Sequence, residues 1–223
     1  MKLDLCQMPV TASKAENYET MRRYVRDAAA AGCDLIVLPE MWCCPYSNAA
    51  FAEYAEPQGG ETWCLLRDTA REYDIWLVAG SVPERDGDAI YNTCYVFDPQ
   101  GAQRAKHRKV HLFDIDVTGG QRFFESDTLS PGQQYTLVDT PFGKLGVAIC
   151  FDVRFAELFR ILALEGAQLI VVPAAFNMTT GPAHWELLIC DIDLSETDAV
   201  RAQIPVLRAR RTDLYQLKYE KDS

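Results

Sequence analysis

Two stretches of the sequence, Gly32–Glu40 and Gly166–Ala174, follow the same plan: a glycine, a continuous apolar run and then a proline. A glycine in this setting typically ends a helix. Apolar runs such as Leu35–Leu38 are typical of strands buried on both faces of a sheet. The repeat therefore predicts two halves of related build, in which helices cover strands. This alternation indicates a layered α/β domain whose site lies at the carboxyl ends of its strands.

The two copies differ in the residue that follows the proline. The first copy ends in Pro39-Glu40, whereas the second ends in Pro173-Ala174. Because the second copy does without an acid, the strand end itself does not require one. Glu40 is therefore a candidate functional residue, and the alternative is a solvated glutamate after a strand.

A second candidate, Cys150, ends another short apolar run. A helical pattern follows, with Phe155, Leu158 and Leu162 at helical spacing and Gly166 as its end. The cysteine is thus expected at a strand-to-helix turn, close to a helix N-terminus. Free N–H groups and the helix dipole favour an anion there, so this position predicts a thiolate. The alternative is a buried structural cysteine.

The remaining pattern fits one α/β domain. Ser13 has capping-box spacing to Glu16 and opens a helix that ends at Gly32, and a second apolar stripe runs from Trp63 to Tyr73. Further strands are expected at residues 3–10, 75–82, 90–97, 104–112 and 135–138. Loops are expected at residues 41–60 and 113–131.

Composition excludes several classes of function. The 223 residues carry a net charge of −10, which argues against nucleic acid or an anionic membrane as a partner. There is no apolar run of membrane-spanning length, and the N-terminus has no signal-peptide pattern. The eight cysteines are scattered without a C-x-x-C pair, which predicts reduced thiols in a cytoplasmic protein and no zinc site.

A cysteine nucleophile needs a base and an oxyanion donor. The chain has three histidines, His107, His111 and His184, so a Cys-His pair is one option. Lys109 lies between the first two on one face of a predicted strand. A lysine beside a carboxylate can donate to an oxyanion while the carboxylate acts as the base. Metal binding by His107 and His111 is not expected, because no third ligand lies nearby in the sequence.

Three blocks, Leu38–Glu40, Arg108–Phe113 and Ile149–Phe155, resemble in order and spacing the signature blocks of the nitrilase, or carbon-nitrogen hydrolase, superfamily. Further stretches are similar to its omega-amidase branch: Phe124–Ser126, Leu129–Gly132, Ala175–Trp185, Ile204–Val206 and Arg211–Tyr215. The resemblance implies an α-β-β-α sandwich with two mixed sheets, its C-terminal half shortened. It implies a single domain over residues 1–223, with residues 204–223 as a C-terminal arm. It also implies a homodimer or higher homo-oligomer.

The resemblance implies roles for individual residues. Cys150 corresponds to the nucleophile, and Glu40 to the general base. Lys109 and the backbone N–H of Phe151 correspond to the oxyanion donors. Glu125 matches the family's second glutamate, which positions the lysine and the substrate. The resemblance implies no cofactor and no metal ion.

The substrate also follows from the resemblance. Arg154 and Thr180 match residues that contact a substrate carboxylate in the omega-amidase branch, and His111 is expected to join them. The implied reaction releases ammonia from monoamides of dicarboxylic acids, such as 2-oxoglutaramate or 2-oxosuccinamate. One alternative is a hydrolase of N-carbamoyl compounds or another linear amide. For Arg154, the alternative is a structural ion pair with Asp152 or Glu157.

The sequence departs from the family after Leu188. There Leu188 leads almost directly into Asp191–Leu194, whereas family members carry a helix and several strands in between. We therefore expect an internal segment to be missing, by shortening of the chain or by omission from this sequence. A shortened, inactive homologue that serves as a binding or scaffold subunit is the corresponding alternative function.

Overall fold

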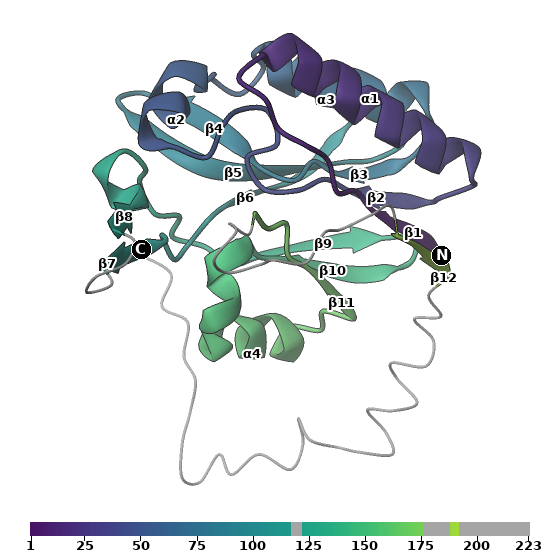
Figure 1. The fold of residues 1–223 in the computed structure, drawn as a ribbon. Helices are drawn as coiled ribbons and strands as arrows, with labels where there is room; N and C mark the ends of the chain where they lie inside the picture. Colours follow the sequence, from purple (N-terminus) through teal and green to yellow (C-terminus); the bar gives the residue numbers. More distant parts are fainter. Residues whose placement is uncertain (117–121, 176–187, 192–223) are drawn as a thin grey trace, which may run out of the picture.

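The computed structural model describes residues 1–116, 122–175 and, as backbone, 188–191. Its layers run helix, sheet, sheet, helix (Figure 1). Helices α1 (Lys14–Ala30) and α3 (Glu61–Glu72) cover the outer face of the larger sheet, and α4 (Ala156–Leu164) covers the smaller one. The predicted α-β-β-α sandwich is confirmed. No helix in the described residues is both long enough and apolar enough to cross a membrane.

The larger sheet is mixed, as predicted. Its strand order is β12-β1-β2-β3-β5-β4, and β6 also pairs with β5. The central strands β1, β2 and β3 are parallel to one another, and the other pairings are antiparallel. The strands are β1 (Lys2–Leu5), β2 (Leu35–Val37), β3 (Trp76–Val78), β4 (Val82–Asp86), β5 (Ala89–Phe97), β6 (Gln103–Arg108) and β12 (Leu188–Asp191).

The smaller sheet holds the second copy of the sequence repeat. Strand β10 (Gly143–Val147) lies between β9 (Thr136–Thr140), which is antiparallel to it, and β11 (Leu169–Val171), which is parallel. A separate ribbon consists of β7 (Asp114–Asp116) and β8 (Arg122–Phe124).

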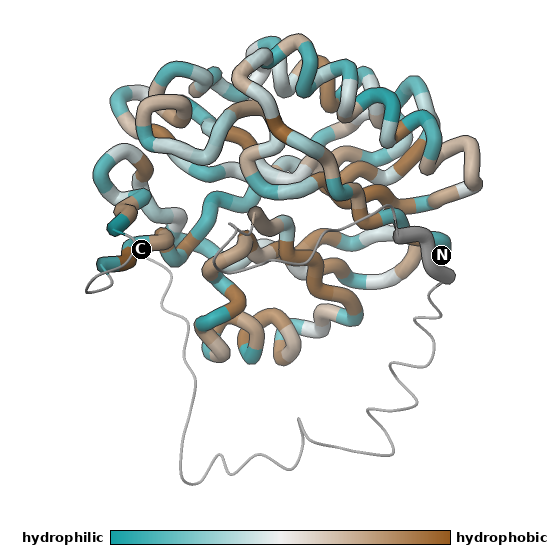
Figure 2. Tube along the Cα trace, in the orientation of Figure 1, coloured by the Kyte–Doolittle hydropathy of each residue, from teal (hydrophilic) through white to brown (hydrophobic). Residues whose placement is uncertain are grey.

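Apolar side chains fill the space between the two sheets. Val37 and Val78 of the larger sheet belong to the same buried cluster as Val147 and Val171 of the smaller one. The larger sheet packs a second cluster against α1 and α3, so its central strands are buried on both faces. This explains their continuous apolar runs. Figure 2 shows the hydrophobic strands gathered at the centre, under a more hydrophilic α1.

The two copies of the repeat meet at their carboxyl ends. The N–H of Glu40, which follows β2, donates to the carbonyl oxygen of Ala174, which follows β11, at 3.4 Å. The N–H of Ala175 donates back to the Glu40 carboxylate at 3.0 Å. The carboxyl ends of β2 and β11, which belong to the two copies of the repeat, are thus in direct contact.

Several sequence-based boundaries were wrong. The expected loop at 41–60 contains α2 (Asn48–Tyr54), which Ser47 caps, and the loop at 113–131 contains β7, β8 and a short 3-10 helix, η1 (Glu125–Asp127). The expected strand 75–82 ends at Val78, and β4 begins at Val82. The strand expected at 104–112 ends at Arg108, because the next carbonyl accepts from the N–H of Gly132 instead of from β5.

Gly80 fixes the segment that carries Glu40. Its φ is +60°, and a Cβ built there would lie 2.0 Å from the carbonyl oxygen of Pro39. The next N–H, that of Ser81, donates to this same oxygen at 3.1 Å. Only glycine permits such a close approach of two backbones.

We expect Gly80→Ala to lower the free energy of unfolding by at least about 3 kcal/mol, as left-handed strain and a backbone clash add. Gly87→Ala is the matched control, because Gly87 has a φ of +59° but open space around a built Cβ. It should cost only the ~1 kcal/mol of left-handed strain. Urea denaturation measures both, and equal losses would refute the close-approach argument.

Candidate active site

Three predicted catalytic residues follow strand ends. Glu40 comes after β2, Lys109 directly after β6, and Cys150 after β10. Parallel and mixed sheets bring such strand ends to one edge, which is where α/β proteins build sites. Both Glu40 and Lys109 are buried, and Cys150 is partly buried. These three residues thus lie at the carboxyl ends of their strands, where the sequence predicts the site.

The Lys109 ammonium lies between two carboxylates. Its Nζ is 2.9 Å from Oε1 of Glu40 and 3.0 Å from Oε2 of Glu125. Burial lowers the pKa of Lys109, but the two carboxylates outweigh burial and hold the pKa above its usual value. The lysine therefore stays protonated, so it can donate to an anion but cannot accept a proton from the thiol.

The Glu40 carboxylate is held from several sides. The side chain of Asn92 donates to Oε1 at 2.8 Å, and the N–H of Ala175 donates to Oε2 at 3.0 Å. The Tyr46 hydroxyl oxygen also lies near Oε1, at 3.2 Å. Several hydrogen bonds to one carboxylate fix its orientation toward its neighbours.

Glu125 is the second buried carboxyl group. It accepts the Tyr46 hydroxyl at 2.5 Å and the N–H of Phe113 at 2.7 Å. Burial raises the pKa of Glu125, and the Glu40 charge adds to this effect although Lys109 opposes it. These contacts suit Glu125 to orienting Lys109 and Tyr46, because its oxygens already have fixed partners.

The Cys150 backbone is strained. Its φ is +42°, in the left-handed region that non-glycine residues rarely adopt. Its N–H donates to the carbonyl oxygen of Pro173 at 2.8 Å, which ties it to the end of β11. The negative charge of the Glu40 carboxylate acts on the Cys150 thiol. Backbone strain of this kind is common at reactive positions.

The predicted helix-stabilised thiolate was wrong. Cys150 begins a short 3-10 helix, η2 (Cys150–Arg154), and α4 begins only at Ala156. Burial raises the pKa of the Cys150 thiol, and the Glu40 carboxylate raises it further. The thiol is therefore protonated at neutral pH and needs a base, for which the Glu40 carboxylate is the candidate.

Two of the histidines face Asp152 instead of Cys150. His111 Nδ1 lies 2.7 Å from Oδ1 of Asp152, and His107 Nε2 lies 3.5 Å from Oδ2. His107 also contacts the Thr136 hydroxyl through Nδ1, at 2.9 Å. Within the described ranges, no cluster of His, Cys, Asp and Glu could hold a metal ion. His184 lies outside the described residues.

Of the residues predicted to bind substrate, His111, Phe151 and Arg154 are described by the structure, and they lie at or near the turn after Cys150. Phe151 is half-buried, and His111 stacks on Phe155 with ring centroids 3.6 Å apart. Arg154 is exposed, and in the part of the chain that the structure describes no ion pair joins it to Asp152 or Glu157. Thr180 lies outside the described residues.

Sequence reasoning missed Tyr46 and Asn92. Tyr46 lies in the segment that was treated as a loop, and nothing in its sequence spacing indicates a role. The sequence did contain a signal for Asn92, because this polar side chain interrupts an otherwise apolar strand face. In the structure Asn92 is buried between Ile90 and Cys94 on that face. A buried polar side chain needs a partner, which here is Glu40.

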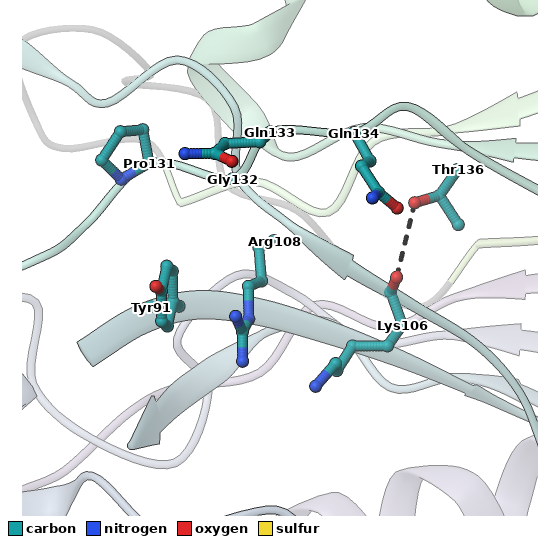
Figure 3. A pocket seen from close by; sticks show the side chains of 8 residues that line it. All are labelled: Tyr91, Lys106, Arg108, Pro131, Gly132, Gln133, Gln134 and Thr136. Atoms are coloured by element: carbon teal, nitrogen blue, oxygen red, sulfur yellow. Dashed lines mark hydrogen bonds between the residues drawn. The ribbon is translucent and has the colours of Figure 1, made fainter. Parts of the chain in front are cut away.

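A separate cavity of about 290 Å³ is lined by none of these candidate residues (Figure 3). Lys106 Nζ and Arg108 Nε in its wall each lie 2.9 Å from the Glu84 carboxylate, and Arg108 also pairs with Asp86. The positive charges of this cavity are thus already neutralised. Its lining residues are Tyr91, Lys106, Arg108, Pro131, Gly132, Gln133, Gln134 and Thr136.

The fold and the strand-end residues match one class of enzyme. Residues 2–221 match the carbon-nitrogen hydrolase family, and the chain belongs to that family. It is 42% identical to the omega-amidase NIT2 of Danio rerio, with 96% of each chain covered. The C. elegans NitFhit protein superposes with a TM-score of 0.87 at 27% identity, over 100% of this chain and 68% of that one.

A third relative bears on the nucleophile. The amidase from Nesterenkonia sp. AN1 superposes with a TM-score of 0.69 at 26% identity, over 79% of this chain and 67% of that one. In one mutant of that amidase, acrylamide has added to the active site cysteine by Michael addition. Together, the family and these relatives support an amidase activity for the chain.

The comparisons also support the expected missing segment. The alignment with the Danio rerio protein spans 265 positions, 42 more than the 223 residues of this chain. At least 42 positions of that relative therefore have no counterpart here. Glu40, Lys109, Glu125 and Cys150 all lie before Leu188, where the sequence departs from the family pattern.

Proposed function

We propose that the chain is an omega-amidase that hydrolyses the terminal amide of small dicarboxylic acid monoamides through a Cys150 thioester. One observation carries this proposal: the Glu40 carboxylate, whose charge acts on the Cys150 thiol, also contacts a buried ammonium that lies between two carboxylates. This arrangement supplies a nucleophile, a base and an oxyanion donor in one buried cluster.

The first half of the reaction forms the thioester. Glu40 takes the proton of the Cys150 thiol, and the sulfur attacks the amide carbon. Lys109 and the N–H of Phe151 stabilise the resulting oxyanion. Glu40 then passes the proton to the leaving nitrogen, the C–N bond breaks, and ammonia departs.

The second half frees the enzyme. Glu40 takes a proton from a water molecule, whose oxygen attacks the thioester carbon. The same donors stabilise the second oxyanion, and the C–S bond then breaks. The proton returns to the sulfur, so the products are a carboxylic acid and the original thiol. In both halves Lys109 keeps its proton, because its two carboxylate neighbours hold its pKa above the usual value.

The far carboxylate of the substrate requires a cationic partner. Arg154 is exposed, lies four residues after Cys150, and has no ion pair with Asp152 or Glu157 within the described ranges. A free guanidinium suits bidentate binding of a carboxylate. His111 and Thr180 complete this proposed contact set.

We expect Arg154→Ala to lower kcat/KM for an ω-amido dicarboxylate by about 100-fold, because a charge-assisted pair with the carboxylate is lost. For a simple aliphatic amide the change should be small. Arg23→Ala on α1 is the control, since this exposed arginine lies on the outer helix. An equal loss for both kinds of substrate would contradict the carboxylate contact.

A panel of amides assayed for ammonia tests the proposed function. Monoamides of dicarboxylic acids, such as 2-oxoglutaramate and 2-oxosuccinamate, should be turned over faster than N-carbamoyl amino acids and aliphatic amides. Preference for the N-carbamoyl compounds would replace the proposed substrate class. No turnover of any member by folded protein would favour an inactive binding subunit, which the intact Glu40, Lys109 and Cys150 cluster does not support.

Three further proposals concern the cellular compartment, the oligomeric state and the partners. The described cysteines are all free thiols, which fits a reducing compartment such as the cytoplasm. The family resemblance supports a homodimer, and light scattering on the purified protein tests it. With a net charge of −10, we propose no nucleic-acid or membrane partner.

A further inference from the structure

Asp152 closes the turn that contains the strained Cys150. Its Oδ2 accepts the N–H of Ile149 at 2.9 Å, and its own N–H donates to the carbonyl oxygen of Ile149 at 3.0 Å. These two hydrogen bonds join Asp152 to Ile149 and so close the short turn in which Cys150 lies. A left-handed backbone costs about 1–2 kcal/mol relative to the right-handed form, so it persists only where neighbours hold it.

The other oxygen of Asp152 reaches the segment that carries Lys109. Oδ1 accepts the backbone N–H of His111 at 2.9 Å and faces His111 Nδ1 at 2.7 Å. Lys109 comes directly after the end of β6, and His111 follows Lys109 by two residues. One buried carboxylate thus joins the turn after β10 to the chain after β6.

The contacts of Asp152 require an ionised carboxylate. Burial raises the pKa of Asp152, but the nearby His107 ring and the hydrogen bonds from Ile149 and His111 outweigh burial and hold the pKa below its usual range. The side chain is fully buried. A buried charge with several donors is costly to replace, because each donor would lose its acceptor.

We infer that Asp152 is a positioning residue that sets the distance and orientation of the Cys150 sulfur relative to the Lys109 ammonium. It touches neither substrate nor reacting atoms and acts through the backbones of Ile149 and His111. This inference rests on the proposed roles of Cys150 and Lys109. A small displacement of a nucleophile from its donor can cost about 100-fold in rate.

The test compares two changes at Asp152. In Asp152→Asn the amide has one oxygen, so its NH₂ group must face either the Ile149 N–H or the donors of His111. We expect kcat to fall about 100-fold while KM changes less than about twofold. The rate of Cys150 alkylation by acrylamide, followed by intact mass, should fall with kcat. Asp152→Glu keeps the charge but is longer by one methylene, so it should not restore activity.

The matched control is Asp139→Asn, at an exposed aspartate of β9 that lies outside the site. It should leave kcat and alkylation unchanged. Thermal melts show whether each variant is folded at the assay temperature. A normal kcat in Asp152→Asn, or recovery in Asp152→Glu, overturns the positioning role. Unfolding of both Asp152 variants also overturns it, in favour of a role in stability.

Failure of the Asp152 inference can be distinguished from failure of the proposed function. If Cys150→Ala retains turnover, the proposed nucleophile is wrong and the Asp152 inference falls with it. If Cys150→Ala is inactive but Asp152→Asn is as fast as the wild type, only the positioning inference fails.

Discussion

Cys150→Ala is expected to release no measurable ammonia from an ω-amido dicarboxylate, a loss of at least about 10⁴-fold in kcat. The reason is that Cys150 is the group proposed to form the covalent intermediate. The thiol follows β10 and is subject to the Glu40 charge, and alanine leaves the Glu40 and Lys109 pair without this nucleophile. Ammonia assays at saturating substrate measure the effect.

Cys64→Ala is the control, because Cys64 is a partly exposed thiol on α3, in contact with the Gly59 carbonyl oxygen. It should keep full activity. Acrylamide should add once to the wild type and to the control, and not at all to Cys150→Ala. Adduct formation at another cysteine with concurrent loss of activity would contradict the assignment.

Glu40→Gln is expected to lower kcat by about 10³-fold, since the neutral amide cannot take the thiol proton or return it to the leaving nitrogen. A second measurement separates this role from a structural one. The Glu40 charge raises the pKa of the Cys150 thiol, so its removal should make the thiol more acidic. We therefore expect alkylation of Cys150 by acrylamide to be at least as fast as in the wild type, although turnover collapses.

The matched control for this change is Glu53→Gln, at an exposed glutamate of α2. Turnover and alkylation should both remain at wild-type rates. If Glu40→Gln slowed alkylation and turnover equally, a misplaced Cys150 would explain the result better than a missing base. Retained turnover in Glu40→Gln would show that a different group accepts the proton.

The sequence predicted most of the architecture because burial on both faces leaves a strong pattern. The apolar runs at 35–38 and 169–172 are strands β2 and β11 in the structure. The errors lie in short elements such as α2 and in strand ends such as that of β6. Such boundaries depend on single backbone hydrogen bonds with distant segments, for example from the Gly132 N–H to the Lys109 carbonyl. The periodicity of apolar residues in the sequence does not reveal these bonds.

For the site, the sequence by itself determined the candidates: Glu40 and Cys150 because each ends an apolar run, and Lys109 because it lies between two histidines on one predicted strand face. Only the tertiary structure decided how they meet. It revealed Tyr46 and Asn92 as partners of Glu40, and it reversed the expected direction of the Cys150 pKa shift. The physical reason is that burial and nearby charge come from residues far apart in the chain. A local helix pattern in the sequence shows neither burial nor nearby charge. The sequence therefore predicted a thiolate at Cys150, whereas the structure indicates a protonated thiol.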